Sequence, residues 1–285
     1  MYFLNWYGFF DATTGVKEYY AGLGTAPCDE FLIPMASYGL NTLASWSDLS
    51  LVPGTRYYGC VRAIDGVGNN RTVASSGVVV DITAPLIGEA RFGRVSGTQQ
   101  LFTSSLHFLA LNWDEAIDEE TGIAKYLVGL GTTPGATDVA LPSSFGTSLV
   151  GAFTSLELVQ NGTYYAQLFA QNPVGLMSNT TTVGITVDAT PPVCTVGLGT
   201  YQSPVVASVP PVPQPTMNFY LKCQDAESGV TSVVFGASRV RGIMEIEAQD
   251  LAQPPGGTVD PVRENIDGTT LVGQLQSGFA YYLVV

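Results

Sequence analysis

The stretch of sequence from Trp113 to Pro134 is repeated 107 positions earlier in the chain, and this repeat constrains the fold more than any other feature. The matching positions are aromatic, turn-forming and apolar residues: Trp6 and Trp113, Asp11 and Asp118, Gly15 and Gly122, Tyr19 and Tyr126, Gly22 and Gly129, Leu23 and Leu130, Gly24 and Gly131, Thr25 and Thr132, and Pro27 and Pro134. A further step of 107 positions reaches Asp225, Gly229 and Gly236. A fixed period of this kind indicates a tandem array of one domain.

The length of the chain fits three copies of this unit. At 285 residues, the period leaves roughly a hundred residues for each copy, which is enough to bury a core of its own. We predict repeats at residues 1–83, 84–190 and 191–285. The first is expected to lack its first strand and the third its last strand, so we interpret Met1 as a boundary within a longer chain.

The local patterns predict short strands joined by turns. Charged residues make up 12% of the chain, about half of the usual ~25%. Residues 2–6 alternate so that Tyr2, Leu4 and Trp6 share one face, as in a half-buried strand. Residues 65–70 have the composition of a hairpin turn, residues 28–50 look polar and irregular, and residues 73–81 are predicted to be a single last strand. These features predict an all-β, antiparallel sandwich.

Several segments resemble the fibronectin type III family. Leu51-x-Pro-Gly-Thr-x-Tyr57, followed by Val61 and Ala63, resembles the sixth-strand signature of that family. The stretch from Leu158 to Tyr164 that leads to Ala170 is similar. The second strand of the family is resembled by two pairs, Leu4 with Trp6 and Leu111 with Trp113.

The two predicted linkers strengthen this resemblance. Residues 80–85 and 187–192 both read Val-Asp-x-Thr-x-Pro, and such linkers resemble those of surface proteins built from fibronectin III-like repeats. The resemblance implies a tandem array of three Ig-like, fibronectin III-like β-sandwiches with an extracellular scaffold or adhesion role. It implies no catalytic residue.

The four cysteines fall in pairs, with Cys28 and Cys60 in the first repeat and Cys194 and Cys223 in the third. Pairing within each repeat is the simplest even distribution and would place the protein in an oxidising compartment, whereas four separate buried thiols are the alternative. In the resembled fold, Cys60 would face outward near Cys28. The other two cysteines would lie on the neighbouring first and second strands of the third repeat.

Three Asn-x-Ser/Thr motifs, at Asn70, Asn161 and Asn179, are predicted sites of N-linked glycans. Each lies in or beside a predicted turn, on the surface where a glycan can be attached. Together with the cysteines and the fold, they favour a secreted or cell-surface glycoprotein. We expect sugar at Asn70 and Asn161 before Asn179.

Charge and motif content exclude several classes of function. A net charge of −13 argues against nucleic acid and anionic membrane as partners. No uncharged apolar run reaches the ~18 residues of a membrane span. His107 is the only histidine and is interpreted as a strand-edge residue, which leaves no base for a catalytic triad and no zinc site. Gly129-Leu-Gly131 is interpreted as a turn and not as a phosphate-binding loop.

The acidic segment Asp118-Glu119-Glu120 supplies candidate ligands for Ca²⁺, a cation that binds carboxylate oxygens. Asp11 and Asp225 with Glu227 occupy the equivalent positions in the other repeats. The alternative is a solvated turn between strands, since the spacing of a calcium-binding loop is absent. No other cofactor is predicted.

Three functions remain open at this point. The first is a structural subunit of a secreted, glycosylated filament, appendage or surface coat, which would self-associate and have no enzymatic activity. Neighbouring subunits could supply missing strands by strand addition. The second is an adhesin or receptor stalk that binds a protein or carbohydrate through its loops, with Trp46 and Tyr38 as candidate contacts. The third is an accessory stretch of a large secreted enzyme. Fold alone does not choose among them.

Overall fold

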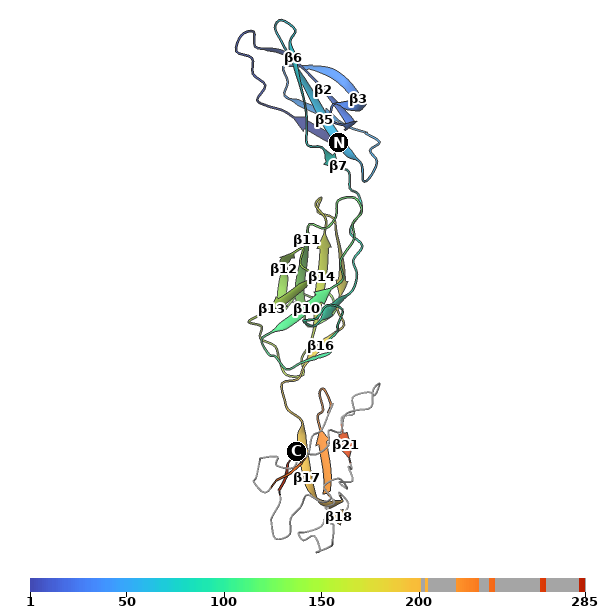
Figure 1. Ribbon diagram of the computed structural model, residues 1–285, viewed down its shortest axis with the longest axis vertical. Helices are drawn as coiled ribbons and strands as arrows, with labels where there is room; N and C mark the ends of the chain where they lie inside the picture. The colour runs from blue at the N-terminus through green and yellow to red at the C-terminus, as the bar shows by residue number, and fades with distance from the viewer. Residues whose placement is uncertain (201–202, 205–218, 231–235, 239–261, 265–281, 285) are drawn as a thin grey trace. The chain divides into compact units, whose positions relative to one another are not determined.

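The computed structural model describes residues 1–200, 203–204, 219–230, 236–238, 262–264 and 282–284. Every regular element in this part of the chain is a β-strand (Figure 1). Nearly all strand pairs are antiparallel, and the exception is a short parallel pair near the end of the second repeat. The predicted all-β fold is therefore confirmed.

The first repeat forms two sheets. In one, β1 (Tyr2–Asn5) pairs with β4 (Leu43–Trp46). The other has the order β3-β2-β5-β6, with β7 also paired to β5. Its strands are β2 (Val16–Ala26), β3 (Asp29–Gly39), β5 (Arg56–Asp65), β6 (Asn70–Ala74) and β7 (Val78–Val79).

The second repeat contains counterparts of the seven strands of the first repeat and two more, β8 and β9. One sheet has the order β13-β10-β8, formed by β8 (Ala90–Phe92), β10 (Leu109–Trp113) and β13 (Val150–Phe153). The other has the order β12-β11-β14-β16-β9, with β15 also paired to β14. Its strands are β9 (Phe102–Thr103), β11 (Lys125–Gly131), β12 (Ala140–Gly146), β14 (Thr163–Gln171), β15 (Met177–Thr181) and β16 (Ile185–Val187). The pairing of β9 with β16 is parallel.

The strands described after residue 190 form two further sheets. One has the order β18-β17-β19-β21 and the other pairs β20 with β22. Their bounds are β17 (Val193–Thr200), β18 (Ser203–Pro204), β19 (Phe219–Gln224), β20 (Gly236–Ser238), β21 (Val262–Glu264) and β22 (Tyr282–Val284). The proline-rich residues from 205 to 215 lie outside the described part of the chain.

The period of 107 residues relates equivalent strands of the first two repeats, and for two pairs of strands it holds to the residue. The bounds of β4 and β13 differ by 107 at both ends, as do those of β6 and β15. Equivalent strands also keep the same neighbours, since β1 pairs with β4 as β10 pairs with β13. This strand order, with the β10 sheet beside the β12-β11-β14 sheet, is that of a fibronectin III-like sandwich.

Each core is built from the alternating positions that the sequence patterns indicate. In the first repeat, Leu4, Trp6, Tyr19 and Val61 are buried together, with Tyr2 packed against them. In the second, every other residue of β14 is buried, which is the period-2 pattern of a strand with one face on the core. Trp113 and Tyr126 are among its largest fully buried side chains.

Three local predictions from the sequence are wrong. Residues 28–50 are not irregular, since they contain β3 and β4. The last strand of the first repeat is broken into β6 and β7, because Gly77 has a φ of +78° and interrupts the extended backbone. Gly129-Leu-Gly131 lies within strand β11 and not in a turn.

By compactness, the chain divides into two units. One contains residues 1–99, 110–153 and 164–184, and the other contains residues 100–109, 154–163 and 185–285. The limits of these two units do not coincide with those of the three predicted repeats, so the repeat boundaries stay a prediction.

Candidate functional site

The first linker is bonded into the second repeat by one buried amide. Asn172, at the end of β14, is 1% exposed. Its Nδ2 donates to Asp81 Oδ2 at 2.8 Å, to the Thr83 carbonyl at 3.1 Å and to Asp118 Oδ2 at 3.2 Å. Its Oδ1 accepts from the backbone N–H of Leu176 at 2.8 Å. One side chain therefore joins the linker, an acidic loop and its own hairpin.

Hydroxyl groups complete this linker network, which we define as Asp81, Thr83, Asp118, Glu120, Thr121 and Asn172. Thr121 Oγ1 donates to Asp81 Oδ2. Thr83 Oγ1 donates to Glu120 Oε2 at 2.6 Å. Oxygens of Asp81, Asp118 and Glu120 all lie within 4.8 Å of one another. The donors offset part of the repulsion among three carboxylates held this close.

Asp118 also shapes the loop that carries it. Its Oδ1 accepts the backbone N–H groups of Thr121 and Gly122, at 2.8 and 3.2 Å. Burial raises the pKa of Asp118, but the hydrogen bonds from Thr121, Asn172 and Gly122 outweigh it, so the pKa lies below its ordinary value. Asp118 is therefore a carboxylate at neutral pH.

A second acidic cluster occupies the equivalent place 107 residues later. Asp188, Asp225 and Glu227 bring their oxygens within the same 4.8 Å, and Asp188 and Asp225 are only 8% and 6% exposed. Asp225 Oδ1 accepts the backbone N–H groups of residues 227, 228 and 229, at 3.1, 2.8 and 3.1 Å. A hydrogen bond from Ser228 is the main cause that lowers the pKa of Asp188.

Asp11 holds the same kind of loop in the first repeat. Its Oδ1 accepts the N–H groups of Thr13, Thr14 and Gly15, at 3.0, 2.6 and 3.0 Å. All three repeats therefore have an aspartate at this position, and in each repeat its carboxylate accepts backbone N–H groups of the turn that follows it. Asp81 and Asp188 join two of these loops to a linker.

The acidic cluster differs from the predicted calcium ligands in one member. Asp118 and Glu120 belong to it, whereas Glu119 is exposed and outside it, and Asp81 completes the set. Sequence reasoning missed Asp81 as a ligand, although its recurrence as Asp188 was a usable signal. Oxygen-only ligands suit Ca²⁺, but Asp81 Oδ2 and both Asp118 oxygens already accept hydrogen bonds. Calcium binding stays a prediction, which thermal unfolding with added Ca²⁺ or Mg²⁺ would test.

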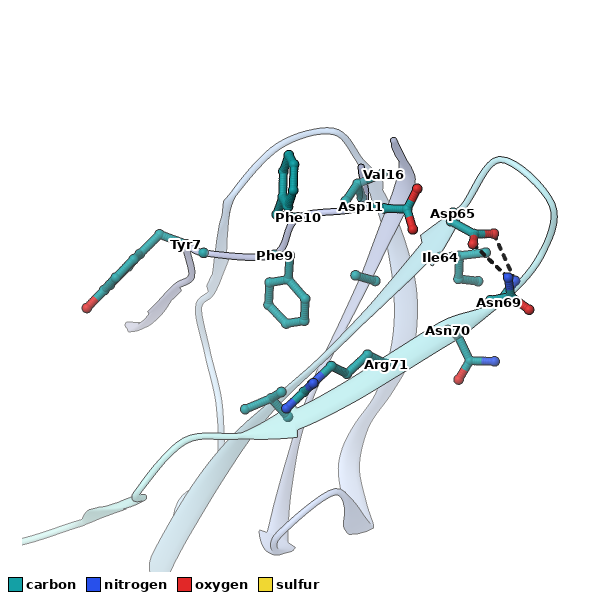
Figure 2. Close-up of a pocket in the computed structure, with 13 residues that line it drawn as sticks. Tyr7, Phe9, Phe10, Asp11, Val16, Ile64, Asp65, Asn69, Asn70 and Arg71 are labelled. Atoms are coloured by element: carbon teal, nitrogen blue, oxygen red, sulfur yellow. Dashed lines mark hydrogen bonds between the residues drawn. The ribbon is translucent and has the colours of Figure 1, made fainter. Parts of the chain in front are cut away.

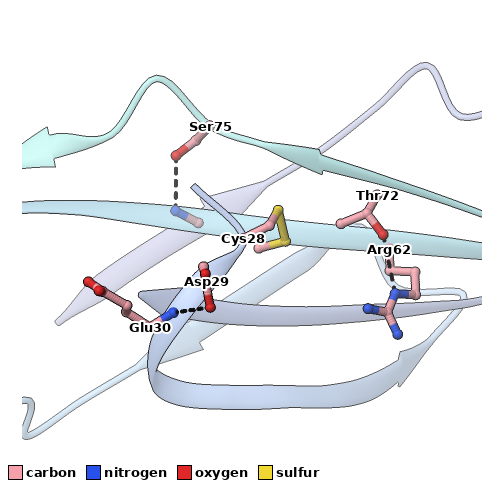
Figure 3. Close-up of a disulfide and its surroundings, with 8 residues drawn as sticks. Cys28, Asp29, Glu30, Arg62, Thr72 and Ser75 are labelled. Carbon is pink, nitrogen blue, oxygen red and sulfur yellow. Dashed lines mark hydrogen bonds between the residues drawn. A yellow bond between two sulfur atoms is a disulfide. The ribbon is translucent and has the colours of Figure 1, made fainter. Parts of the chain in front are cut away.

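The four cysteines form the two pairs expected within repeats. Cys28 is bonded to Cys60, and Figure 3 shows this disulfide as a yellow bond. Cys60 is fully buried, and because successive side chains of a strand point to opposite faces, it lies on the face of β5 opposite the core residue Val61. Cys194 is bonded to Cys223, directly opposite it across strands β17 and β19. Each bridge therefore links neighbouring parts of one sheet.

All three predicted glycan-acceptor asparagines are exposed. Asn70 begins β6 and Asn179 lies within β15. Asn161 lies in a turn with a φ of +62°, and its Nδ2 is 3.4 Å from Glu227 Oε1. Attachment of sugar at these positions stays a prediction.

The single histidine has a backbone partner. His107 Nδ1 lies 2.7 Å from the Leu156 carbonyl, and because a carbonyl only accepts, Nδ1 carries the proton. This contact joins two chain segments. His107 lies in a bend two residues before β10 begins at Leu109, and not within the strand as the sequence predicted.

The exposed loop aromatics are not those proposed from the sequence. Tyr38 and Trp46 are half-buried, with ring centroids 6.4 Å apart, so they belong to the packed part of the first repeat. Tyr7 and Phe10 are exposed instead, at 94% and 86%. The distinction depends on burial, which aromatic content alone does not show.

These aromatics border a hollow of about 540 Å³ at one end of the first repeat. Figure 2 shows the loop from Tyr7 to Asp11 on one side and β6 with Asn70 and Arg71 on the other. Val16 and Ile64 contribute apolar walls. A space of this size is within the range of ligand-binding pockets, ~300–1,000 Å³.

Comparisons with known proteins gave similarities to solved structures only. No protein-family model matches the sequence, and the search of the curated proteins gave no match. Among solved structures, the chicken CNTN1 FN1–FN3 domains are 14% identical, with a TM-score of 0.35 over 60% of this chain and 56% of that chain. The fibronectin(III)-like modules of Clostridium thermocellum CbhA are 12% identical, with a TM-score of 0.36 over 62% of this chain and 80% of that chain.

A third structure, a tetra-tandem repeat in the extending region of a large adhesion protein, is 14% identical, with a TM-score of 0.32 over 94% of this chain and 65% of that chain. The chain thus spans less than two thirds of the first and third of these structures. Similarities at this level do not identify a function. Within the described residues, no helix has the length and apolar character needed to cross a membrane.

Proposed function

We propose that this chain is part of a secreted, glycosylated structural protein, a filament, appendage or surface coat assembled from fibronectin III-like repeats. The observation that supports it best is the linker network. The linker residues Asp81 and Thr83 are bonded to buried Asn172 of the following repeat. An acidic set with the same spacing recurs at the second linker. Linkers held in this way suit a protein that transmits load along its length.

Two further features favour an extracellular location. Both cysteine pairs are oxidised, which is typical of secreted and surface proteins. The three asparagines of the glycan motifs are exposed, as attachment requires. These features support secretion without specifying a filament.

Imaging of the protein by electron microscopy, combined with glycopeptide mass spectrometry of the same sample, tests this proposal. We expect regular fibres or arrays, with sugar on Asn70 and Asn161. Dispersed monomers over a wide concentration range would overturn the assembly role. Absence of sugar from protein made in a glycosylating secretory pathway would overturn the glycoprotein assignment.

One observation favours the alternative, an adhesin or receptor stalk. The exposed Tyr7 and Phe10 beside an open hollow resemble a recognition surface, because monomeric proteins rarely leave such apolar groups together in water. A saturable affinity of the monomer for a foreign protein or carbohydrate would favour this function over self-assembly.

A further inference from the structure

The second repeat contains a pocket of about 470 Å³, formed entirely by its own residues. The pocket lies between the loop that leads from β10 to β11 and the turn that joins β12 to β13. Its volume is within the range of ligand-binding pockets, ~300–1,000 Å³. Its lining includes Glu115, Ala116, Ile117, Ile123, Tyr126 and Leu149.

Backbone hydrogen bonds hold the two segments that form this pocket. The Trp113 N–H donates to the Leu149 carbonyl at 3.1 Å, which fixes the turn beside the end of β10. Leu86 and Ile117 exchange both backbone hydrogen bonds, at 2.7 and 2.9 Å, so the segment that precedes the loop is also in place. Because its walls are bonded in this way, the pocket is present before any ligand arrives.

The first repeat has an aromatic ring at the position where this pocket is lined by alanine. Ala116 stands 107 positions after Phe9. The Phe9 ring packs against Tyr19, with ring centroids 5.7 Å apart, and Tyr19 is the counterpart of Tyr126. The second repeat therefore lacks the phenyl group that packs beside this tyrosine in the first. The chain itself thus indicates which kind of side chain suits the position.

Apolar side chains line the pocket from both segments. Ile117 and Ile123 belong to the loop and Leu149 to the turn. Ile117 is 60% exposed, and Leu149 stands where the first repeat has Thr42. Apolar groups that gather around an open pocket indicate a binding surface for an apolar ligand.

Two polar groups would orient such a ligand. Tyr126 is 2% exposed, and its hydroxyl oxygen accepts the Ala116 N–H at 2.8 Å, yet no described residue accepts the hydroxyl proton. Burial is the main cause that raises the pKa of this hydroxyl, and the charge of Glu115 adds to it, so the group is a donor at neutral pH. Glu115 is exposed and forms no ion pair with any described residue.

We propose that this pocket binds an aromatic side chain of another protein, tyrosine in preference to phenylalanine, that stands next to a lysine or arginine. The ring would occupy the space beside Ala116, its hydroxyl oxygen would accept from Tyr126, and the basic side chain would pair with Glu115. Aromatic residues seated in a pocket are frequent anchors of protein interfaces. The site goes beyond the proposed function, because one repeat forms it and no fibre is required.

An NMR titration of the whole 285-residue chain, labelled on isoleucine and leucine methyl groups, tests the pocket. The probe is the peptide glycine-tyrosine-lysine-glycine, blocked at both ends. We expect saturable shifts at Ile117, Ile123 and Leu149. A peptide with alanine for tyrosine should bind at least about tenfold more weakly, because the ring contributes most of the buried area. The phenylalanine peptide should lie between the two. Absence of saturable shifts at these methyl groups would overturn the site.

A matched pair of variants locates the bound ring. Ala116→Phe supplies the chain's own ring and should weaken binding of the tyrosine peptide at least about tenfold. Ala124→Phe makes the same change at an exposed alanine of the same repeat that does not line the pocket, and should leave binding unchanged. Equal affinities of the two variants would overturn the assignment of the ring to this pocket. A lower unfolding midpoint for Ala116→Phe alone would move the comparison to the charge variants.

The charge variants test the basic neighbour of the ring at exposed positions, where folding is not at risk. Glu115→Lys should weaken the lysine peptide and strengthen the same peptide with glutamate in place of lysine. Glu119→Lys makes the same change beside the pocket, at a residue that does not line it, and should discriminate less between the two peptides. Equal discrimination by both variants would overturn the pairing with Glu115.

The outcomes also separate this site from the filament. Saturable binding by a chain that forms no fibres would support the pocket and overturn the proposed assembly. Fibres from a chain that does not bind the peptide would overturn the pocket alone. Shifts of the same methyl groups when the protein is concentrated without peptide would overturn the foreign partner and assign the pocket to a second copy of this chain.

Discussion

The side chain that joins the first linker to the second repeat is Asn172, and its removal should be costly. Asn172→Ala leaves Asp81 and Asp118 without one donor each and leaves the N–H of Leu176 without its side-chain acceptor. Loss of hydrogen bonds to charged groups at a buried position costs about 2–4 kcal/mol. Equilibrium denaturation should show a loss of this size in the free energy of unfolding.

Asn179→Ala is the matched control for this change. Asn179 is exposed and its Oδ1 accepts from Gln167 at the surface. Surface substitutions of this kind usually change stability by less than about 0.5 kcal/mol. Both proteins should be made without glycosylation. Equal stability of the two variants would contradict a stabilising role for the linker network.

The pKa values of Asp118 and Asp188 give a second residue-level prediction. Hydrogen bonds hold both below their ordinary values. A carboxyl group with a lowered folded-state pKa stabilises the fold above its unfolded pKa, near 3.8, and this stabilisation is lost as pH falls through the folded value. The thermal unfolding midpoint should therefore fall steeply below about pH 4.

Asp118→Asn isolates one contribution to this acid sensitivity. Asparagine does not titrate. The variant should therefore lose less stability than the original protein when the pH falls from 5 to below the folded-state pKa of Asp118. Thermal scans at matched ionic strength provide the comparison. Parallel pH profiles for the two proteins would show that Asp118 does not contribute to the linkage.

Among the elements, the β2–β3 hairpin and the β11–β12 hairpin each contain a glycine at which an added methyl group would meet the facing backbone. A Cβ on Gly131 would lie 2.3 Å from the Ala136 carbonyl oxygen, and one on Gly24 would lie 2.3 Å from that of Asp29. The repeated Gly-Leu-Gly motif is therefore explained by close approach of two backbones. Gly131→Ala should destabilise the protein by about 1–3 kcal/mol, the cost of overpacking.

Denaturation with urea checks the glycine prediction, and Ser143→Ala on the exposed strand β12 serves as its control. The control should remain within about 0.5 kcal/mol of the original protein. A Gly131→Ala protein as stable as the control would show that the hairpin can relax around the added methyl group.

The disulfide between Cys28 and Cys60 also stabilises the fold by joining elements, since it links the turn after β2 to strand β5. It closes a loop with a sequence separation of 32 residues. In the chain-entropy model, such a loop stabilises the fold by about 3–4 kcal/mol through the unfolded state. Replacing both cysteines by alanine should lower the free energy of unfolding by about that amount, whereas an unchanged midpoint would place the bridge outside the cooperative unit.

The sequence predicts strands well where apolar residues alternate with polar ones, because this pattern marks the buried face of a strand. Strands β10 and β14 carry Trp113 and alternating buried residues, and the 107-residue period locates their counterparts. Strand β3 escaped prediction because most of its residues, from Asp29 to Gly39, are exposed and Pro34 interrupts the pattern. An edge strand with little burial has almost no period-2 hydrophobic signal.

The linker network was harder to predict for a different reason. Asp81, Asp118 and Asn172 are far apart in the sequence and meet only in the folded second repeat. The turn role of Asp118 follows from its neighbours Thr121 and Gly122, so the sequence showed that part. The period also marked Asp81 without indicating its partners, because contacts between distant segments are not encoded in local pattern.

At the scale of the whole molecule, glycans would decide which surfaces remain free for assembly. Asn70 and Asn161 lie at turns, and Asn179 lies within β15, all on exposed positions. We expect sugar at Asn70 and Asn161, and less at Asn179. Glycopeptide mass spectrometry of protein from a glycosylating secretory host measures the occupancy at each site.

In the proposed fibres, removal of the proposed glycans should change how the fibres pack against one another while leaving each fibre intact. A bulky, hydrated sugar keeps neighbouring surfaces apart. Exposed apolar residues such as Val67 and Val174 would otherwise be available for lateral contact. The triple variant Asn70→Gln, Asn161→Gln and Asn179→Gln is therefore expected to form thicker bundles in electron micrographs. Bundles of unchanged width would show that the glycans do not limit lateral packing, and loss of fibres altogether would assign the sugar a direct part in assembly.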